Sequence, residues 1–100
     1  MPDGDWPFDQ TPDTGCFTLR SIVFGGAPIL RVSHDGDGHD WQFLGLGDPN
    51  EADACIVGLG EMVRLDVTLL ELAKLPAGWH AWRESTSSPW QASPVPHRDE

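Results

Sequence analysis

Residues 29–44 read ILRVSHDGDGHDWQFL, and the fold prediction rests mainly on this stretch. Its two ends, 29–34 and 41–44, alternate apolar and polar side chains over short distances, as strands do. The segment between them, 35–40, holds three Asp and two Gly, which favour tight turns through local backbone hydrogen bonds and positive φ. The stretch therefore predicts two strands joined by a polar hairpin tip.

Further strand signals lie on both sides of this stretch. Residues 17–24 are rich in β-branched and aromatic side chains and are followed by Gly and Pro at 25–28, so we expect a strand that pairs with 29–34. Residues 54–59 form an unbroken apolar run, which is typical of a central strand. Residues 79–83 predict a last short strand with two Trp.

The best helical segment is 61–75. Asp66 can cap a second helix within it, so the segment divides into two short helices, and Pro76 and Gly78 end the helical pattern. Together the elements predict the α+β class, with a mostly antiparallel sheet of four to five strands and one or two short helices packed on one face.

The two ends of the chain differ in composition from its middle. Residues 1–15 hold three Pro and four Asp and no base, which predicts a flexible acidic arm, and residues 85–100 predict a flexible Pro/Ser-rich tail. Residues 16–84 then form a single globular domain. Trp6 and Trp90 are the side chains with which the arm and the tail could dock on it.

The charge balance limits the choice of partner. Sixteen Asp and Glu oppose six Lys and Arg, which gives a formal net charge of −10. This charge would repel a phosphate backbone and an anionic membrane surface, so we expect neither nucleic acid nor a membrane as partner. Between Arg31 and Lys74 the sequence has many acids and one base, Arg64. A charged partner of this segment should therefore be a basic protein.

The cysteine content favours a reducing compartment. Cys16 and Cys55 are too few for the disulfide framework of a small secreted domain, so we interpret them as reduced thiols. Cys55 lies in the apolar run and should be buried, whereas Cys16 lies at a strand start. The first eight residues carry acids where a signal peptide needs bases, and no apolar run is long enough to span a membrane. We expect a cytoplasmic protein.

Residues 34–40 hold the densest group of possible metal ligands, two imidazoles and three carboxylates. Such groups can bind a divalent cation. The spacing excludes an EF-hand, because the sixth position counted from Asp35 is Asp40 and not Gly, and the twelfth is Leu46 and not Glu. The same residue types are those of a solvated tight turn, and with this interpretation we assign no metal ligand.

Motifs of the common enzyme classes are missing from the sequence. There is no nucleophile elbow, phosphate-binding loop, zinc-protease helix or dinucleotide-binding fingerprint, so we expect no catalytic residue and no cofactor.

Tryptophan is the remaining unusual feature of the composition, with five in the chain. Trp side chains serve as anchors at protein interfaces, and they also supply the bulk that a small core needs, so Trp41 is a candidate for either role. With the acidic tip, they suggest a set of partner-binding residues: Asp35, Asp37, Asp40, Trp41 and Trp82.

Two stretches carry a resemblance to known proteins. They are SHDGDGHDWQFLG at 33–45 and LDVTLL at 65–70 with LPAGWHAWR at 75–83 and Trp90. Over roughly residues 16–90 the chain resembles a family of small bacterial proteins of unknown function. Residues 37–45 also resemble a domain family with an acidic Asp-x-x-Trp turn that is similar to bacterial immunity proteins. The resemblance implies a compact α+β domain that binds another protein, and it carries over no catalytic residue.

The sequence leaves two hypotheses of different classes. The first is a non-enzymatic protein-binding module, of the immunity or regulatory kind, that presents an acidic surface with Trp anchors to a basic partner. The alternative is a small metal- or ligand-dependent hydrolytic enzyme that uses the Asp35–Asp40 loop. A bound metal ion would favour the second.

Overall fold

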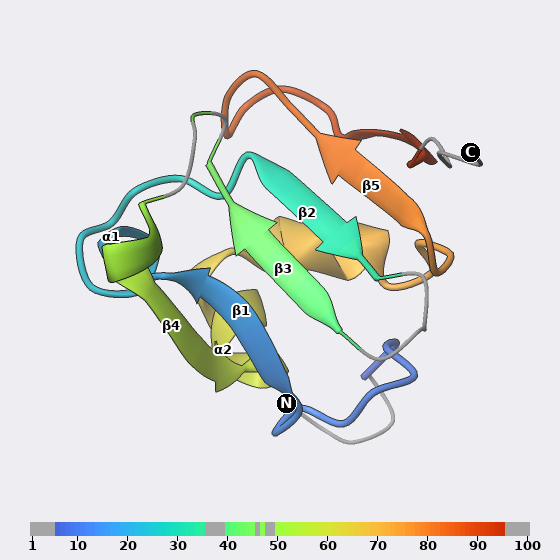
Figure 1. Cartoon of the computed structure of the whole chain (residues 1–100). Coiled ribbons are helices and arrows are strands. Elements are labelled where there is room, and N and C mark those ends of the chain that lie inside the picture. Colours follow the sequence, from blue (N-terminus) through green and yellow to red (C-terminus); the bar gives the residue numbers. More distant parts are fainter. Residues whose placement is uncertain (1–5, 36–39, 46, 48–49, 96–100) are drawn as a thin grey trace, which may run out of the picture.

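The computed structural model describes residues 6–35, 40–45, 47 and 50–95. They form an α+β domain around a six-stranded open sheet with the strand order β4-β1-β3-β2-β5-β6 (Figure 1). The strands are β1 (Gly15–Leu19), β2 (Arg31–His34), β3 (Trp41–Leu44), β4 (Ala54–Gly58), β5 (Trp79–Trp82) and β6 (Gln91–Pro94). The helical elements are α1 (Arg20–Val23), η2 (Glu51–Asp53), α2 (Leu59–Leu65) and η3 (Val67–Leu72).

The sheet is mostly antiparallel, as the sequence predicts. Its exception is the parallel pair β1–β3, in which Phe17 faces Gln42. Strands β2 and β3 form the predicted hairpin, with Val32 opposite Phe43. The described strands number six rather than four to five, because β6 adds to the sheet beside β5.

The helical elements α2 and η3 cover one face of the sheet (Figure 1). Alternation along β2 and β3 turns Val32, Trp41 and Phe43 toward them, and each of these side chains is about 1% exposed. Asp66 caps η3 as predicted, because its carboxylate accepts a hydrogen bond from the Thr68 backbone N–H at 3.0 Å. The helical segment therefore divides at the predicted residue.

The first strand is shorter than predicted and has other neighbours. β1 ends at Leu19, the short helix α1 follows, and β1 lies between β3 and β4 rather than beside β2. The helical turn brings Ile22 into the core, where it is 3% exposed. The buried hydroxyl of Thr18 donates to the carbonyl of Phe43 at 2.8 Å, which adds to the β1–β3 pairing. The β-branched residues in 17–24 thus predicted one strand where the structure has a strand followed by a short helix.

The apolar run 54–59 is not a central strand, which corrects the prediction. β4 lies at one edge of the sheet, and its Ile56 is 64% exposed. The run joins two elements, since its last residue, Leu59, begins α2 and is fully buried. One thiol also differs from expectation, because Cys55 is half-buried rather than buried, whereas Cys16 lies at the start of β1, as predicted, and is buried.

The packed part of the chain extends beyond the predicted range 16–84 on both sides. The ring of Phe8 is buried and meets that of Trp41 edge-on, with a centroid distance of 5.4 Å. On the other side, β6 pairs with β5, and Trp90 packs against the core. The proline-rich composition of the two ends hides these apolar contacts, which only the fold brings together.

Candidate protein-interaction surface

The sheet face opposite α2 and η3 is uncovered by these helices, and we call it the open face (Figure 1). Because side chains alternate along strands, the register places one row of residues across it. This row runs through Ile56, Phe17, Gln42, Ser33, His80 and Ser93. It continues over all six strands.

An apolar pair lies at the β4 end of the open face. Phe17 and Ile56 are directly opposite each other on β1 and β4, so their side chains are neighbours. They are 45% and 64% exposed, whereas Cys16, one residue before Phe17, turns to the core and is 1% exposed. The two side chains therefore form a small exposed apolar patch on the open face.

An acidic pair lies on the same face, where β2 and β3 meet the predicted hairpin tip. The backbone N–H of Asp35 donates to the carbonyl of Asp40 at 2.9 Å, which extends the hairpin register by one pair. Alternation places both side chains on the open face. Two like charges directly opposite each other destabilise a sheet, so this pair favours a cation or a cationic side chain beside it.

The negative charge of Asp40 affects the ionisation of the buried Cys16 thiol. Burial, and after it the negative charge of Asp40, raises the pKa of the Cys16 thiol to about 12. Cys16 is therefore a protonated core side chain at neutral pH, and its sulfur donates to the carbonyl of Thr14 at 3.6 Å.

Trp82 lies on the open face as well, near its other end. It follows the buried Ala81 in β5, so its own side chain points the opposite way, and it is half-buried beside His80 with a ring distance of 5.1 Å. Its cross-strand neighbour is Arg31, whose guanidinium donates to the carbonyl of Gly45 at 3.0 Å. Three of the predicted partner-binding residues, Asp35, Asp40 and Trp82, thus share one face.

Trp41 does not belong to this surface, which corrects its assignment as a partner-binding residue. It lies on the covered face, its indole N–H donates to Oε1 of Gln10 at 3.0 Å, and its ring stacks on His34 with a centroid distance of 4.1 Å. Alternation in β3 decides between its two predicted roles in favour of the core. Asp37, the fifth predicted residue, lies outside the described residues.

The two sides of the sheet separate the metal ligands suggested by the sequence. His34 turns to the covered face, where its Nδ1 is 2.8 Å from the carbonyl oxygen of Leu75, whereas Asp35 and Asp40 lie on the open face. In the described part of the chain, no three His, Cys, Asp or Glu side chains come together to hold a metal ion. Residues 36–39, which include His39, lie outside the described residues.

The structure has a buried ionic cluster behind the sheet that the sequence did not predict. Arg83 is 1% exposed; its Nε and Nη2 donate to the carbonyl of Ile29 at 3.1 and 2.9 Å, and Nη2 also pairs with the carboxylate of Asp66. Its Nη1 donates to Thr68 Oγ1 at 3.0 Å, and its guanidinium carbon lies 4.2 Å from the ring centroid of Trp90. Strand alternation, which points residue 83 inward after 81, is the sequence signal that could have revealed it.

This cluster sets the charge state of Asp66. Partial burial alone would raise the pKa of Asp66, but hydrogen bonds from Thr68 and Arg83 and the positive charge of Arg83 outweigh it and hold the pKa below its ordinary value. The carboxylate is therefore committed to interactions within the chain, and its role is structural.

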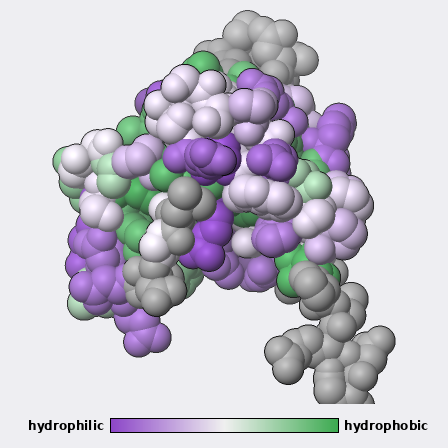
Figure 2. Space-filling view, turned by 90° about the horizontal axis from the view of Figure 1, so that it is seen from above, coloured by the Kyte–Doolittle hydropathy of each residue, from purple (hydrophilic) through white to green (hydrophobic). Residues whose placement is uncertain are grey.

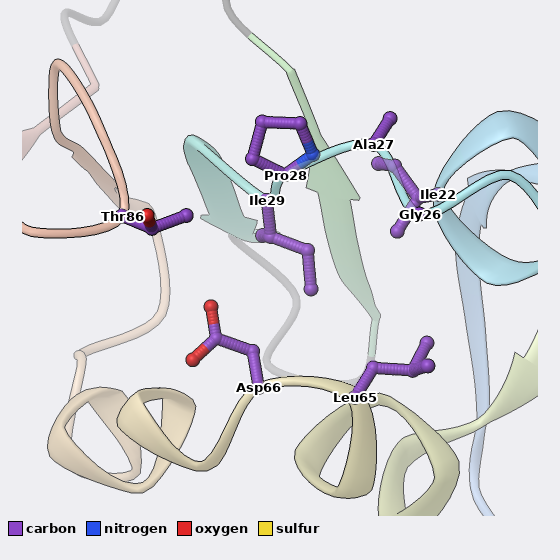
Figure 3. A pocket seen from close by; sticks show the side chains of 8 residues that line it. All are labelled: Ile22, Gly26, Ala27, Pro28, Ile29, Leu65, Asp66 and Thr86. Atoms are coloured by element: carbon purple, nitrogen blue, oxygen red, sulfur yellow. The ribbon is translucent and has the colours of Figure 1, made fainter.

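A shallow hollow beside the cluster offers little for a small ligand (Figure 3). It measures about 200 Å³, below the roughly 300–1,000 Å³ of common ligand pockets. It is lined mainly by apolar groups, including those of Ile22, Pro28, Ile29 and Leu65, and the carboxylate of Asp66 points into it. Because that carboxylate already binds Arg83 and Thr68, the hollow lacks the convergent polar groups of a catalytic site.

The surface seen from above shows no large continuous apolar area (Figure 2). Seen from above, apolar side chains lie in small separate areas between hydrophilic ones (Figure 2). The open face, with its adjacent apolar and acidic pairs, is therefore the best candidate for recognition.

Comparison of the chain with protein-family models, with curated proteins and with solved structures finds no match. The family resemblance inferred from the sequence stays a prediction. Among the described residues, no helix has the length and apolar character needed to cross a membrane.

Proposed function

We propose that this protein is a non-enzymatic binding module whose open face docks on a basic protein. The observation that carries the proposal is the exposed apolar pair of Phe17 and Ile56, on the face that also holds the opposed carboxylates of Asp35 and Asp40. Hydrophobic surface supplies most of the free energy of protein association, and charge supplies orientation and association rate.

Each part of the open face has a separate role in this proposal. Phe17 and Ile56 lose their water shell against apolar groups of the partner. A Lys or Arg of the partner lies between Asp35 and Asp40, which removes the repulsion between the two carboxylates. Trp82 supplies a half-buried aromatic edge at the far end of the contact. A module of this kind acts by covering a surface of its partner, as immunity and regulatory proteins do.

The cytoplasm is the compartment that fits the proposal. Cys16 and Cys55 are both free thiols, and a reducing environment keeps them so. The net charge of −10 keeps copies of the protein apart while it attracts basic partners.

Affinity capture from a native lysate tests the proposal with matched baits. We expect the wild-type bait to retain a basic protein at about 10 mM salt and to release it at about 1 M, because salt screens the charges. The double variant Asp35→Asn/Asp40→Asn should lose that protein. The control Asp9→Asn/Glu71→Gln removes two charges from exposed residues outside the open face, Glu71 being in η3 on the covered side, and should retain it.

A second pair of baits tests the apolar contribution. Phe17→Ser removes the exposed ring from the open face and should weaken capture, whereas Phe24→Ser removes an 80% exposed ring next to α1 and should not. Identical sets of captured proteins from all baits, or no basic protein at all at low salt, would refute the proposed function.

A further inference from the structure

Within the part of the fold that the structure describes, the edge strand β4 has a neighbouring strand on one side only, so some of its backbone hydrogen-bonding groups face no strand. It pairs with β1 on one side, and it is the terminal strand of the sheet. Facing residues of an antiparallel pair alternate between those that exchange hydrogen bonds and those that do not. The N–H of Leu59 donates to the carbonyl of Thr14 at 2.9 Å, so the pairs Cys16–Val57 and Thr18–Cys55 exchange the bonds that follow. The N–H and C=O of Ile56 therefore point away from β1, toward the free edge.

This edge lacks the protection that sheet edges usually carry. Proteins blunt their edge strands with charged side chains, Pro or bulges. The opposite edge strand, β6, follows this rule, since it has polar Gln91 and Ser93 and ends in Pro94, which has no N–H. Strand β4 reads ACIVG, without a charge or a Pro, and its central side chain is 64% exposed. Its edge is open to another strand.

Charges at both ends of β4 indicate which strand fits. Glu51 and Asp53 precede it in η2, and Glu61 follows it in the first turn of α2. Asp13 lies beside Gly58, because a Cβ at that glycine would be 3.8 Å from the Cα of Asp13. The bases near this edge are Arg20, which donates to the carbonyl of Ala52, and Arg64, which pairs with Glu61. Acids outnumber bases here, so the edge is complementary to a positively charged strand.

The same charges disfavour a second copy of this chain as the occupant. A symmetric antiparallel pair of β4 strands centred on Ile56 would bring Glu51 of one copy toward Glu61 of the other at both ends. Each chain also carries a net charge of −10. Like charges oppose such a dimer, and they leave the edge accessible to a basic partner.

We infer that β4 binds an extended segment of a basic protein as an additional strand of the sheet. The segment alternates apolar with Lys or Arg side chains: its apolar side chains meet Ile56 and Phe17 on the open face, and its bases face the acids at the two ends of β4. The backbone N–H and C=O of Ile56 supply hydrogen bonds that do not depend on sequence. This inference rests on the proposed function and specifies how the partner attaches.

Synthetic peptides titrated into the 15N-labelled full chain test the inference. The probe is a nine-residue peptide of alternating Lys and Val with blocked ends. One control peptide replaces Lys with Glu, and another keeps the Lys but has a Pro at its centre, which prevents strand pairing. We expect saturable amide shifts across Ala54–Gly58 with the probe alone, and hydrogen exchange of the Ile56 amide at least about tenfold slower at saturation.

Two proline variants, at positions whose side chains are similarly exposed, test the backbone contact. Ile56→Pro removes the outward N–H and should weaken probe binding by at least about tenfold. Val67→Pro changes a 66% exposed side chain at the first position of η3, where helical segments accept Pro, and should leave binding within about twofold. Circular dichroism establishes that both variants are folded.

Ile56→Lys keeps the test decisive if the proline variant does not fold. It retains the backbone N–H but adds a positive charge to the centre of the edge, so binding should shift from the Lys peptide toward the Glu peptide. An unchanged preference would count against the edge as the binding site.

Other outcomes separate this inference from the proposed function. Shifts on Gln42, Ser33 and His80 with an unchanged Ile56 amide would mean that a partner lies flat on the open face, which overturns the strand inference and leaves the function standing. No binding of the Lys peptide would also overturn the inference, and the lysate experiment would then decide the function alone. A concentration-dependent dimer in sedimentation that Ile56→Pro abolishes would identify a second copy as the occupant and overturn it as well.

Discussion

Replacing Arg83 by Met tests the buried ionic cluster that joins β5 to the start of β2, to η3 and to Trp90. The substitution keeps an unbranched, largely apolar side chain of similar length and removes the guanidinium. In the wild type this group is 1% exposed and binds the Ile29 carbonyl, Asp66 and Thr68. Arg83→Met removes all of these contacts.

The expected cost follows from the groups left behind. The buried carbonyl of Ile29 loses its side-chain donors, at roughly 1–3 kcal/mol. Trp90 loses a cation above its ring, at about 0.5–2 kcal/mol. Asp66 keeps its two hydrogen bonds from Thr68, and its side chain is 18% exposed, so water partly replaces the lost charge. We expect Arg83→Met to lower the free energy of unfolding by about 3–5 kcal/mol, as for other broken buried ion pairs.

Urea unfolding followed by Trp fluorescence measures this cost. Arg64→Met is the control, because Arg64 is 83% exposed and its ion pair with Glu61 is 3.9 Å long; it should cost less than about 0.5 kcal/mol. A loss below about 1 kcal/mol for Arg83→Met, with an unchanged dependence on urea, would refute the conclusion that the cluster holds these elements together.

Three further predictions concern acid stability, the core and the acidic pair. The pKa of Asp66 is lowered in the folded state, so the stabilisation by its carboxylate is present above the ordinary pKa of 3.8 and is lost as pH falls through the folded-state pKa. Arg83→Met should weaken this loss of stability in acid, which urea melts at stepped pH measure. An unchanged slope of unfolding free energy against pH would contradict Arg83 as a cause of the shift. Trp41→Ala should cost about 3–5 kcal/mol in the same assay, whereas a cost under about 1 would mean that the ring is not core. Asp40→Asn should stabilise the fold by a few tenths of a kcal/mol because it relieves the repulsion from Asp35, and destabilisation would contradict a net repulsion between the two carboxylates.

The parts of the fold that depend on local patterns were predictable. Alternation around Val32 and Phe43 identified the hairpin, and the cap preference of Asp identified Asp66 as the residue where the helical segment divides. These signals work because neighbouring residues alone decide them. Most of the α+β architecture follows from them.

The remaining differences arise where distant segments decide the structure. An apolar run such as 54–59 fits a central strand and also fits an edge strand that leads into a buried helix, and only the position of β1 between β3 and β4 distinguishes them. The sequence named Asp35, Asp40 and Trp82 for their chemistry, but it could not show that they share a face. It missed Ile56 because exposure at a sheet edge is a property of the whole sheet.

The position of β1 also has a consequence for synthesis. Strand β1 lies between β3 and β4, and both of these come later in the chain. Strand β1 therefore leaves the ribosome before either of its neighbours has been synthesised. The core-facing side chains of β1 stay exposed to solvent while β2 and β3 form their local hairpin. Pairing over such sequence distances slows folding, because the intervening chain must lose entropy first. Strand β1 can pair with β3 only after residue 44 has emerged, so the nascent chain carries an unpaired strand while about 25 residues beyond β1 are synthesised. The left half of the sheet in Figure 1 is complete only after residue 58 has emerged and β4 has joined β1.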